Sequence, residues 1–181
     1  LLPNSRDVYS GALLRVRQPS ELRLHSVLRI FVMTCGVCAK HSSHEALPGG
    51  VIFQDDLIFI AHFPFSESKP PHYGHLIIEL KRHIGTPSAM TEAEAMAVGS
   101  WNLRTSQFLE NQLGAEHTYL FRIGDVTPHL HFHAVPRFSG TPREIWGVYL
   151  YDNPLGKKAD RESVQKISER ARSYFKERGF L

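Results

Sequence analysis

The chain has 181 residues, of which 42% are hydrophobic and 22% charged, as expected for a globular domain with a sizeable core. Lys and Arg number 21 against 18 Asp and Glu, so the net charge of +3 gives no electrostatic case for a nucleic-acid or membrane partner. No apolar run approaches the roughly 20 residues of a membrane helix, and two cysteines cannot build a disulfide framework.

The chain begins with a basic segment, residues 1–32, whose only acidic residues are Asp7 and Glu21. Such a leader is a targeting peptide, a segment added for expression or an over-extended gene start. In each case we expect the functional protein to begin near Met33. The sequence is therefore divided into a leader at 1–32, a domain at 33–146 and a C-terminal extension with a helix at 147–181.

Cys35 and Cys38 follow the leader with Cys-x-x-Cys spacing. This spacing is typical of half of a metal site or of a redox pair, and it fits an extracellular disulfide less well. A thioredoxin-type redox pair belongs to a βαβ unit, and the pattern around Cys-Gly-Val-Cys does not predict one. The metal half-site is therefore the favoured interpretation.

The remaining elements alternate between apolar runs of strand length and two amphipathic helices. Thr91 and Glu94 form a capping box, which predicts a helix from there to about Gln112, with Gly114 as its stop signal. A second helix is expected from about Asp160 to Arg178. Strands are expected at residues 51–53, 57–61, 74–80, 118–123 and 129–138. This order predicts an α+β fold with an antiparallel sheet.

The most informative segment places three histidines at alternate positions of one expected strand: His129, His131 and His133. The period of a strand puts all three on one face, which is an unusual arrangement for packing alone. Neutral imidazole is a competent nucleophile toward phosphorus, and its neighbours can hold phosphate oxygens. Three histidines also suit a catalytic zinc, but successive side chains on a flat strand diverge and converge poorly on one ion.

The segment 129–135 resembles the His-φ-His-φ-His-φ-φ signature of the histidine triad (HIT) family, in which φ is an apolar residue. Residues 74–83 are similar to the family's preceding strand, with Leu80 where the family often has Pro. The cysteine pair resembles that of the zinc-containing Hint-like and dinucleoside polyphosphate hydrolase-like branches. The resemblance implies a HIT-like antiparallel sheet with one long helix, and a homodimer.

The resemblance also implies roles for individual residues. His131 would be the nucleophile, with His133 and His75 around the phosphate. The Hint branch usually has Gln and Ser in the loop before the triad, and here Thr127 is the candidate for these phosphate contacts. A zinc ion would be held by Cys35, Cys38, His83 and His129. Two Cys and two His complete a tetrahedral site, which is typical of a structural zinc.

The function implied is a nucleotidyl hydrolase that cleaves nucleoside phosphoramidates or dinucleoside polyphosphates at the α-phosphorus. It would pass through a nucleotidyl-histidine and release a nucleoside monophosphate. Two alternatives stay open: a dinucleoside polyphosphate phosphorylase, and a zinc-stabilised nucleotide-binding protein with little activity. We expect a cytoplasmic protein whose partners are a nucleotide and a second copy of the chain, with neither a membrane nor a nucleic acid involved.

Overall fold

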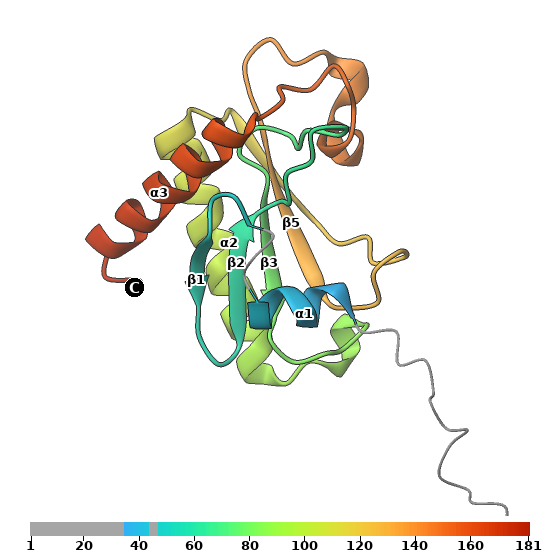
Figure 1. The fold of residues 1–181 in the computed structure, drawn as a ribbon, viewed down its shortest axis with the longest axis vertical. Coiled ribbons are helices and arrows are strands. Elements are labelled where there is room, and N and C mark those ends of the chain that lie inside the picture. The colour runs from blue at the N-terminus through green and yellow to red at the C-terminus, as the bar shows by residue number, and fades with distance from the viewer. Residues whose placement is uncertain (1–34, 44–46) are drawn as a thin grey trace, which may run out of the picture. The chain divides into compact units, whose positions relative to one another are not determined.

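The computed structural model describes residues 35–43 and 47–181. The expected leader at 1–32 and the start of the domain at Met33 lie outside the described residues. Within the described residues, five strands that all pair antiparallel form one sheet, and three α-helices accompany it (Figure 1). The predicted α+β class, with one long helix and a C-terminal helix, is confirmed.

The two predicted helices begin and end close to the expected residues. They are α2 (Glu92–Leu113) and α3 (Arg161–Glu177). The capping box is present, because Thr91 Oγ1 accepts a hydrogen bond from the Glu94 N–H and the Glu94 carboxylate accepts one from the Thr91 N–H. Gly114 ends α2 in the left-handed conformation, at a φ of 73°, and Asp160 caps the start of α3.

The sheet has the strand order β1-β2-β3-β5-β4. Its members overlap the five predicted runs: β1 (Val51–Gln54), β2 (Ile58–His62), β3 (Leu76–Leu80), β4 (His117–Phe121) and β5 (His131–Arg137). The two strands that carry the sequence motifs, β3 and β5, are neighbours near the centre of the sheet. Their register sets Glu79 opposite His131 and Ile77 opposite His133.

Side chains alternate between the two faces of the sheet, and each face has a different cover. Helices α2 and α3 cover one face, where the main hydrophobic core includes Ile60, Leu76, Ile78, Trp101, Phe108 and Phe175. The other face bears His131 and His133 of β5. Helix α1 (Gly36–Ser43) crosses this face, as Figure 1 shows. Two short 3₁₀ helices, η2 (Arg143–Ile145) and η3 (Gly147–Tyr151), pack against strands β4 and β5.

Helix α1 is a feature that the sequence did not predict. Its segment, GVCAKHSS, is short and has no apolar stripe of helical period. Contacts with distant residues support it instead, since Lys40 and His41 both bond to Glu79 on β3. A helix of this length depends on such tertiary contacts for its stability.

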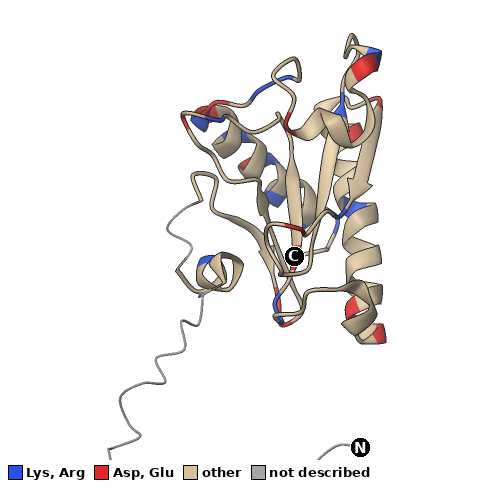
Figure 2. Cartoon of the chain, turned by 90° about the vertical axis from the view of Figure 1, so that its right-hand side faces the viewer, with Lys and Arg blue, Asp and Glu red and all other residues tan. Residues whose placement is uncertain are grey.

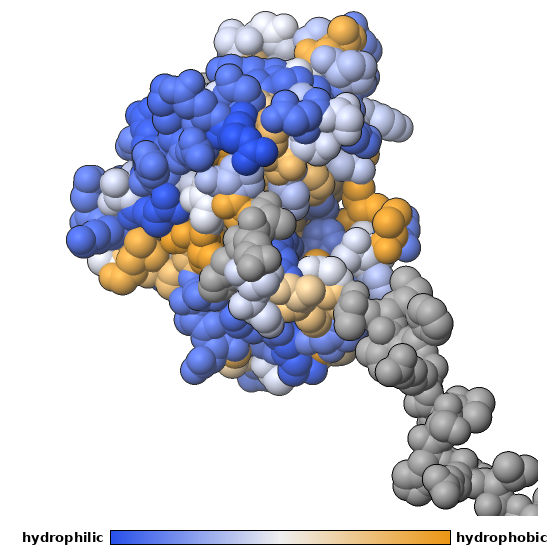
Figure 3. All heavy atoms as spheres, in the orientation of Figure 1, coloured by the Kyte–Doolittle hydropathy of each residue, from blue (hydrophilic) through white to orange (hydrophobic). Residues whose placement is uncertain are grey.

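The helix predicted within residues 147–181 shares the core of the sheet. Phe175 of α3 packs against Trp101 of α2, with ring centroids 5.3 Å apart. The outward side of α3 is hydrophilic (Figure 3), and basic and acidic residues are interspersed over the described chain (Figure 2). None of the described helices is long and apolar enough to cross a membrane.

Candidate active site

Four residues predicted as metal ligands come together beside the start of α1. The ligand atoms of Cys35, Cys38, His83 and His129 all lie within 4.8 Å of one another. They reach this point from three places in the chain: Cys35 and Cys38 at the start of α1, His83 just after β3, and His129 just before β5. Pairing of β3 with β5 brings the two histidines to the same end of the sheet.

Three sulfur–nitrogen distances within this cluster are close to those of a tetrahedral zinc site. Cys38 Sγ lies 3.4 Å from His83 Nδ1 and 3.5 Å from His129 Nδ1, and Cys35 Sγ also lies 3.5 Å from His129 Nδ1. Zn–S bonds of about 2.3 Å and Zn–N bonds of about 2.0–2.1 Å at tetrahedral angles separate sulfur from nitrogen by about 3.6 Å. The four residues therefore fit a zinc ion with no coordination position left open.

The ring of His129 is already oriented for such a role. Its Nε2 lies 2.7 Å from the carbonyl oxygen of Leu80. Because a carbonyl only accepts, Nε2 carries the proton and Nδ1 presents its lone pair to the cysteines. Burial lowers the pKa of His129, which favours the neutral ring that binds a metal.

The Cys38 thiol lacks the lowered pKa of a reactive cysteine. Cys35 and Cys38 are both free, and burial together with the adjacent Cys35 raises the pKa of Cys38. Reactive Cys-x-x-Cys motifs instead have a thiol whose pKa is lowered. The geometry thus favours the metal half-site over the redox alternative.

His131 stands on β5 outside the cysteine cluster. Its Nδ1 lies 2.6 Å from the carbonyl oxygen of His129, so Nδ1 carries the proton and its N–H donates a hydrogen bond to that carbonyl. The neutral ring consequently has its lone pair on Nε2, which is the atom needed for nucleophilic attack. His129, which belongs to the candidate metal cluster, therefore also sets the tautomer and the ring orientation of His131 through its backbone carbonyl.

His133 and His75 form a buried pair next to His131. His75 Nε2 lies 2.9 Å from His133 Nδ1, and the His75 ring stacks on Phe63. Burial and the adjacent His131 lower the pKa of His133 to about 4. Burial, and after it the adjacent His133, lowers the pKa of His75 well below its usual range. Both rings are therefore neutral at physiological pH.

His75 is fully buried and lines neither cavity described below. Among the described residues, no polar group pairs with its Nδ1. A buried N–H without a partner is less favourable than an unused lone pair. The proton of His75 is therefore best placed on Nε2, whose N–H donates a hydrogen bond to His133 Nδ1. His133 then carries its own proton on Nε2. In this structure His75 can reach a phosphate only through His133.

Two cavities meet at His131. One, of about 180 Å³, is lined by α1, β3 and the turn after β2; the other, of about 240 Å³, lies toward the loop at 123–127 and η3. His131, Phe63 and Thr127 line both cavities, and His133 lines the second. Because ligand pockets usually measure about 300–1,000 Å³, a nucleotide-sized ligand would occupy both and pass His131.

Sequence reasoning missed several residues of this site. Lys40 and Glu79 line the smaller cavity, and Tyr151 of η3 lines the larger one, with its ring 5.7 Å from that of His133. One signal for Glu79 was present, because a lone carboxylate within the apolar run Leu-Ile-Ile-Glu-Leu is rarely buried without a partner. Nothing local pointed to Lys40 or Tyr151.

The Glu79 carboxylate is ionised in this setting. Burial by itself would raise its pKa, but the hydrogen bond with His41 and the charge of Lys40 outweigh burial and hold the pKa below its ordinary value. Glu79 bonds to Lys40 Nζ at 2.6 Å and to His41 Nε2 at 2.9 Å. The smaller cavity therefore contains a carboxylate and an ammonium group beside His131.

No protein-family model matches the sequence, and no curated protein matches it. Solved structures do match the fold. A Zn-bound histidine triad family protein from Mycobacterium smegmatis is 17% identical, with a TM-score of 0.58 over 81% of this chain and 96% of its own. A hypothetical histidine triad nucleotide-binding protein from Sulfolobus tokodaii is 18% identical, with a TM-score of 0.57 over 79% of this chain and 93% of its own.

A third similar structure is the diadenosine triphosphate hydrolase of Plasmodium falciparum, 14% identical, with a TM-score of 0.51 over 72% of this chain and 78% of its own. At these identities the likeness establishes the fold, which is that of histidine triad proteins, and the expected resemblance is confirmed at that level. The assigned roles of the site residues, the homodimer and the cytoplasmic location remain predictions.

Proposed function

We propose that this protein is a nucleotidyl hydrolase of the histidine triad type, with His131 as the nucleophile. The observation that carries the proposal is the bond from His131 Nδ1–H to the His129 carbonyl, which leaves the Nε2 lone pair of His131 where two cavities meet. The names of similar structures, a nucleotide-binding protein and a diadenosine triphosphate hydrolase, support the substrate class.

In the proposed reaction, His131 Nε2 attacks the α-phosphorus of a nucleoside phosphoramidate or dinucleoside polyphosphate. A P–N bond forms between Nε2 and phosphorus while the bond from phosphorus to the leaving group breaks, and the leaving group takes up a proton from water. Water then attacks the nucleotidyl-histidine, releases the nucleoside monophosphate and restores the free ring. Each step keeps phosphorus between the same two cavities.

The neighbouring residues supply hydrogen bonds to the phosphate. His133, neutral and protonated at Nε2, would donate to a non-bridging oxygen or to the leaving group, and His75 would hold the His133 ring in position. Thr127 lines both cavities and offers a hydroxyl to the same phosphate. His75 is thus proposed as a positioning residue that acts through His133.

We further propose that Cys35, Cys38, His83 and His129 hold a structural zinc ion. When bound, the ion would supply cross-links between α1, the end of β3 and the start of β5, and its closed ligand set leaves no place for a substrate. Its link to the reaction runs through the backbone, because the His129 carbonyl orients the His131 ring.

The test is release of AMP from adenosine 5′-phosphoramidate and from diadenosine polyphosphates by the zinc-loaded protein. Replacing His131 by Ala should abolish release while the fold and zinc content stay unchanged. Replacing His117 by Ala, an exposed position on β4, provides the matched control and should keep wild-type rates. Retained activity in the first variant would refute the assignment of the nucleophile.

The covalent intermediate can be sought by quenching a reaction in alkali, which preserves a phosphorus–nitrogen bond, and measuring intact mass. A nucleotidyl adduct is expected on the wild type and not after His131→Ala. Adding inorganic phosphate separates hydrolase from phosphorylase, because phosphate as acceptor yields a nucleoside diphosphate. Thermal stabilisation by AMP without any turnover would instead indicate a nucleotide-binding protein.

A further inference from the structure

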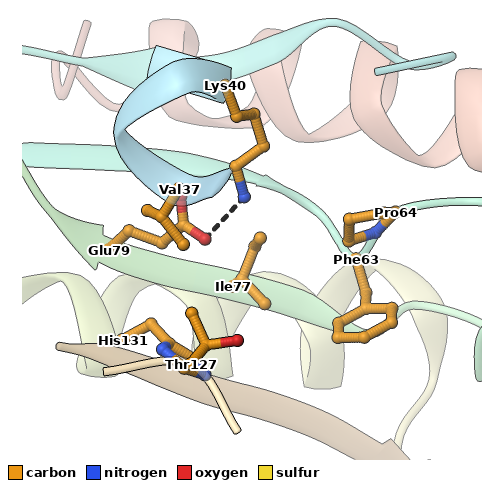
Figure 4. Close-up of a pocket in the computed structure, with 8 residues that line it drawn as sticks. All are labelled: Val37, Lys40, Phe63, Pro64, Ile77, Glu79, Thr127 and His131. Carbon is orange, nitrogen blue, oxygen red and sulfur yellow. Dashed lines mark hydrogen bonds and ion pairs between the residues drawn. The ribbon is translucent and has the colours of Figure 1, made fainter. Parts of the chain in front are cut away.

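A buried ion pair lies in the smaller cavity, where the reaction proposed above does not use it. Lys40 reaches from α1 to Glu79 on β3, as Figure 4 shows, with Nζ 2.6 Å from Oε1. The side chains of Lys40 and Glu79 are only 11% and 3% exposed. Removing two charges from water is unfavourable unless each is well paired, so their position at a cavity wall calls for a reason.

The pair is adjacent to the candidate nucleophile. Glu79 and His131 are direct partners in the register of β3 and β5, and alternation puts their side chains on the same face. Figure 4 shows Ile77 standing between the ion pair and Phe63, with His131 and Thr127 beneath. The cavity thus combines an apolar slot with one charged pair next to the reacting atom.

The hydrogen-bonding capacity of the pair is only partly used. Glu79 accepts one bond at each oxygen, from Lys40 and from His41, and each carboxylate oxygen can accept a second. Lys40 has three N–H donors, and within the described chain Glu79 accepts from one of them. A ligand here would meet acceptors for two hydroxyls and a donor for an oxygen, which is the complement of a vicinal diol.

A 5′-nucleotide presents such a diol a few bonds away from its α-phosphorus. With the phosphorus at His131 Nε2, the sugar has to lie next to that residue. In the smaller cavity the described polar groups besides His131 are Glu79, Lys40 and Thr127, and Glu79 is the only carboxylate among them. The apolar walls, Val37, Phe63, Pro64 and Ile77, suit the base and the carbon side of the sugar.

We infer that Glu79, paired with Lys40, binds the ribose hydroxyls and makes the enzyme selective for ribonucleotides over deoxyribonucleotides. This inference rests on the proposed function and adds a specificity-determining residue to it. The competing explanation is that Glu79 only fastens α1 to the sheet through Lys40 and His41. The two explanations differ in whether the effect of Glu79 depends on the sugar of the substrate.

The experiment compares kcat/KM for adenosine 5′-phosphoramidate with that for its 2′,3′-dideoxy analogue. Wild type should lose roughly 10- to 100-fold on the analogue, the range for hydroxyl bonds to a charged acceptor. Glu79→Gln should lose a similar factor on the ribose substrate, yet change little on the analogue. A Glu79→Gln loss that is equal for both substrates, or a wild type without sugar discrimination, would overturn the inference.

Glu94→Gln provides the matched control. Glu94 is another buried carboxylate paired with a cation, Arg82, and it lines neither cavity. Its variant should keep the wild-type ratio between the two substrates. If Glu79→Gln does not fold, Lys40→Met removes the other partner and should lower the same ratio; an unchanged ratio in a folded Lys40→Met variant would count against the inference.

Failure of the proposed function can be told apart from failure of this inference. If the wild type turns over no nucleotide, protection against thermal unfolding by AMP and by 2′,3′-dideoxy-AMP still measures sugar recognition. Stronger protection by AMP that disappears in Glu79→Gln would support the ribose site without catalysis. Equal protection by the two ligands would overturn the ribose site itself.

Discussion

Acidification should destabilise this protein because several of its histidines are buried in the neutral form, and His62 allows one of them to be measured separately. His62 ends β2 and is 2% exposed. Its Nδ1–H donates to the carbonyl of Phe63 at 3.0 Å, and no polar group among the described residues pairs with Nε2. Burial lowers the pKa of His62 from 6.5 to about 4.

The sign follows from which state binds the proton. Between pH 6.5 and 4 the unfolded chain is protonated at this position while the folded chain is not. The free energy of unfolding therefore decreases as the pH is lowered. At about 1.4 kcal/mol for each pH unit, this one residue removes roughly 3 kcal/mol by pH 4. The contribution is complete above pH 6.5 and is lost as the pH falls toward 4.

The assay is urea unfolding of wild type and His62→Gln at several values between pH 7.5 and 4.5. The amide does not titrate, so the difference in stability between the two proteins should shift by roughly 2–3 kcal/mol in favour of the variant over this range. Other histidines and the metal ligands titrate in both proteins, and their effects cancel in the difference. Parallel curves for the two proteins would refute the reasoning.

Three further changes test other parts of the structure. Cys35→Ser removes one thiolate ligand, so metal analysis should find less than one zinc per chain and a lower Tm; a wild type that holds no zinc and is unaffected by chelators would contradict this. Gly49→Ala places a Cβ against Ser168 and 2.9 Å from the carbonyl oxygen of Val164, and should cost about 1–3 kcal/mol in urea unfolding; unchanged stability would mean that this contact can relax freely. Gly99→Ala, where a Cβ meets no atom within 4 Å in the exposed part of α2, should stabilise the protein by about 0.5–1 kcal/mol; a lower Tm would contradict the helix-propensity argument.

Much of the fold was predictable because its signals are local. The capping box at Thr91, the stop at Gly114 and the apolar runs place helices and strands through interactions between residues a few positions apart. Alternation along one strand likewise put His131 and His133 on a common face, as the structure has them. The antiparallel sheet follows from the order of these elements.

The site depends on contacts that no local pattern contains. Cys35 meets His129 across 94 positions, His75 meets His133 across 58, and Lys40 meets Glu79 across 39. Helix α1 has no amphipathic period of its own and is supported by such contacts.

The sequence by itself therefore determined the five strands, the two longer helices and the residue types that the proposed reaction would use. Only the tertiary structure decided that His75 contacts His133 from the buried side and that a carboxylate–ammonium pair, Glu79 and Lys40, lies beside His131. The physical reason is that secondary structure reflects short-range periodicity, whereas pairing and burial of polar groups depend on which distant segments the sheet brings together.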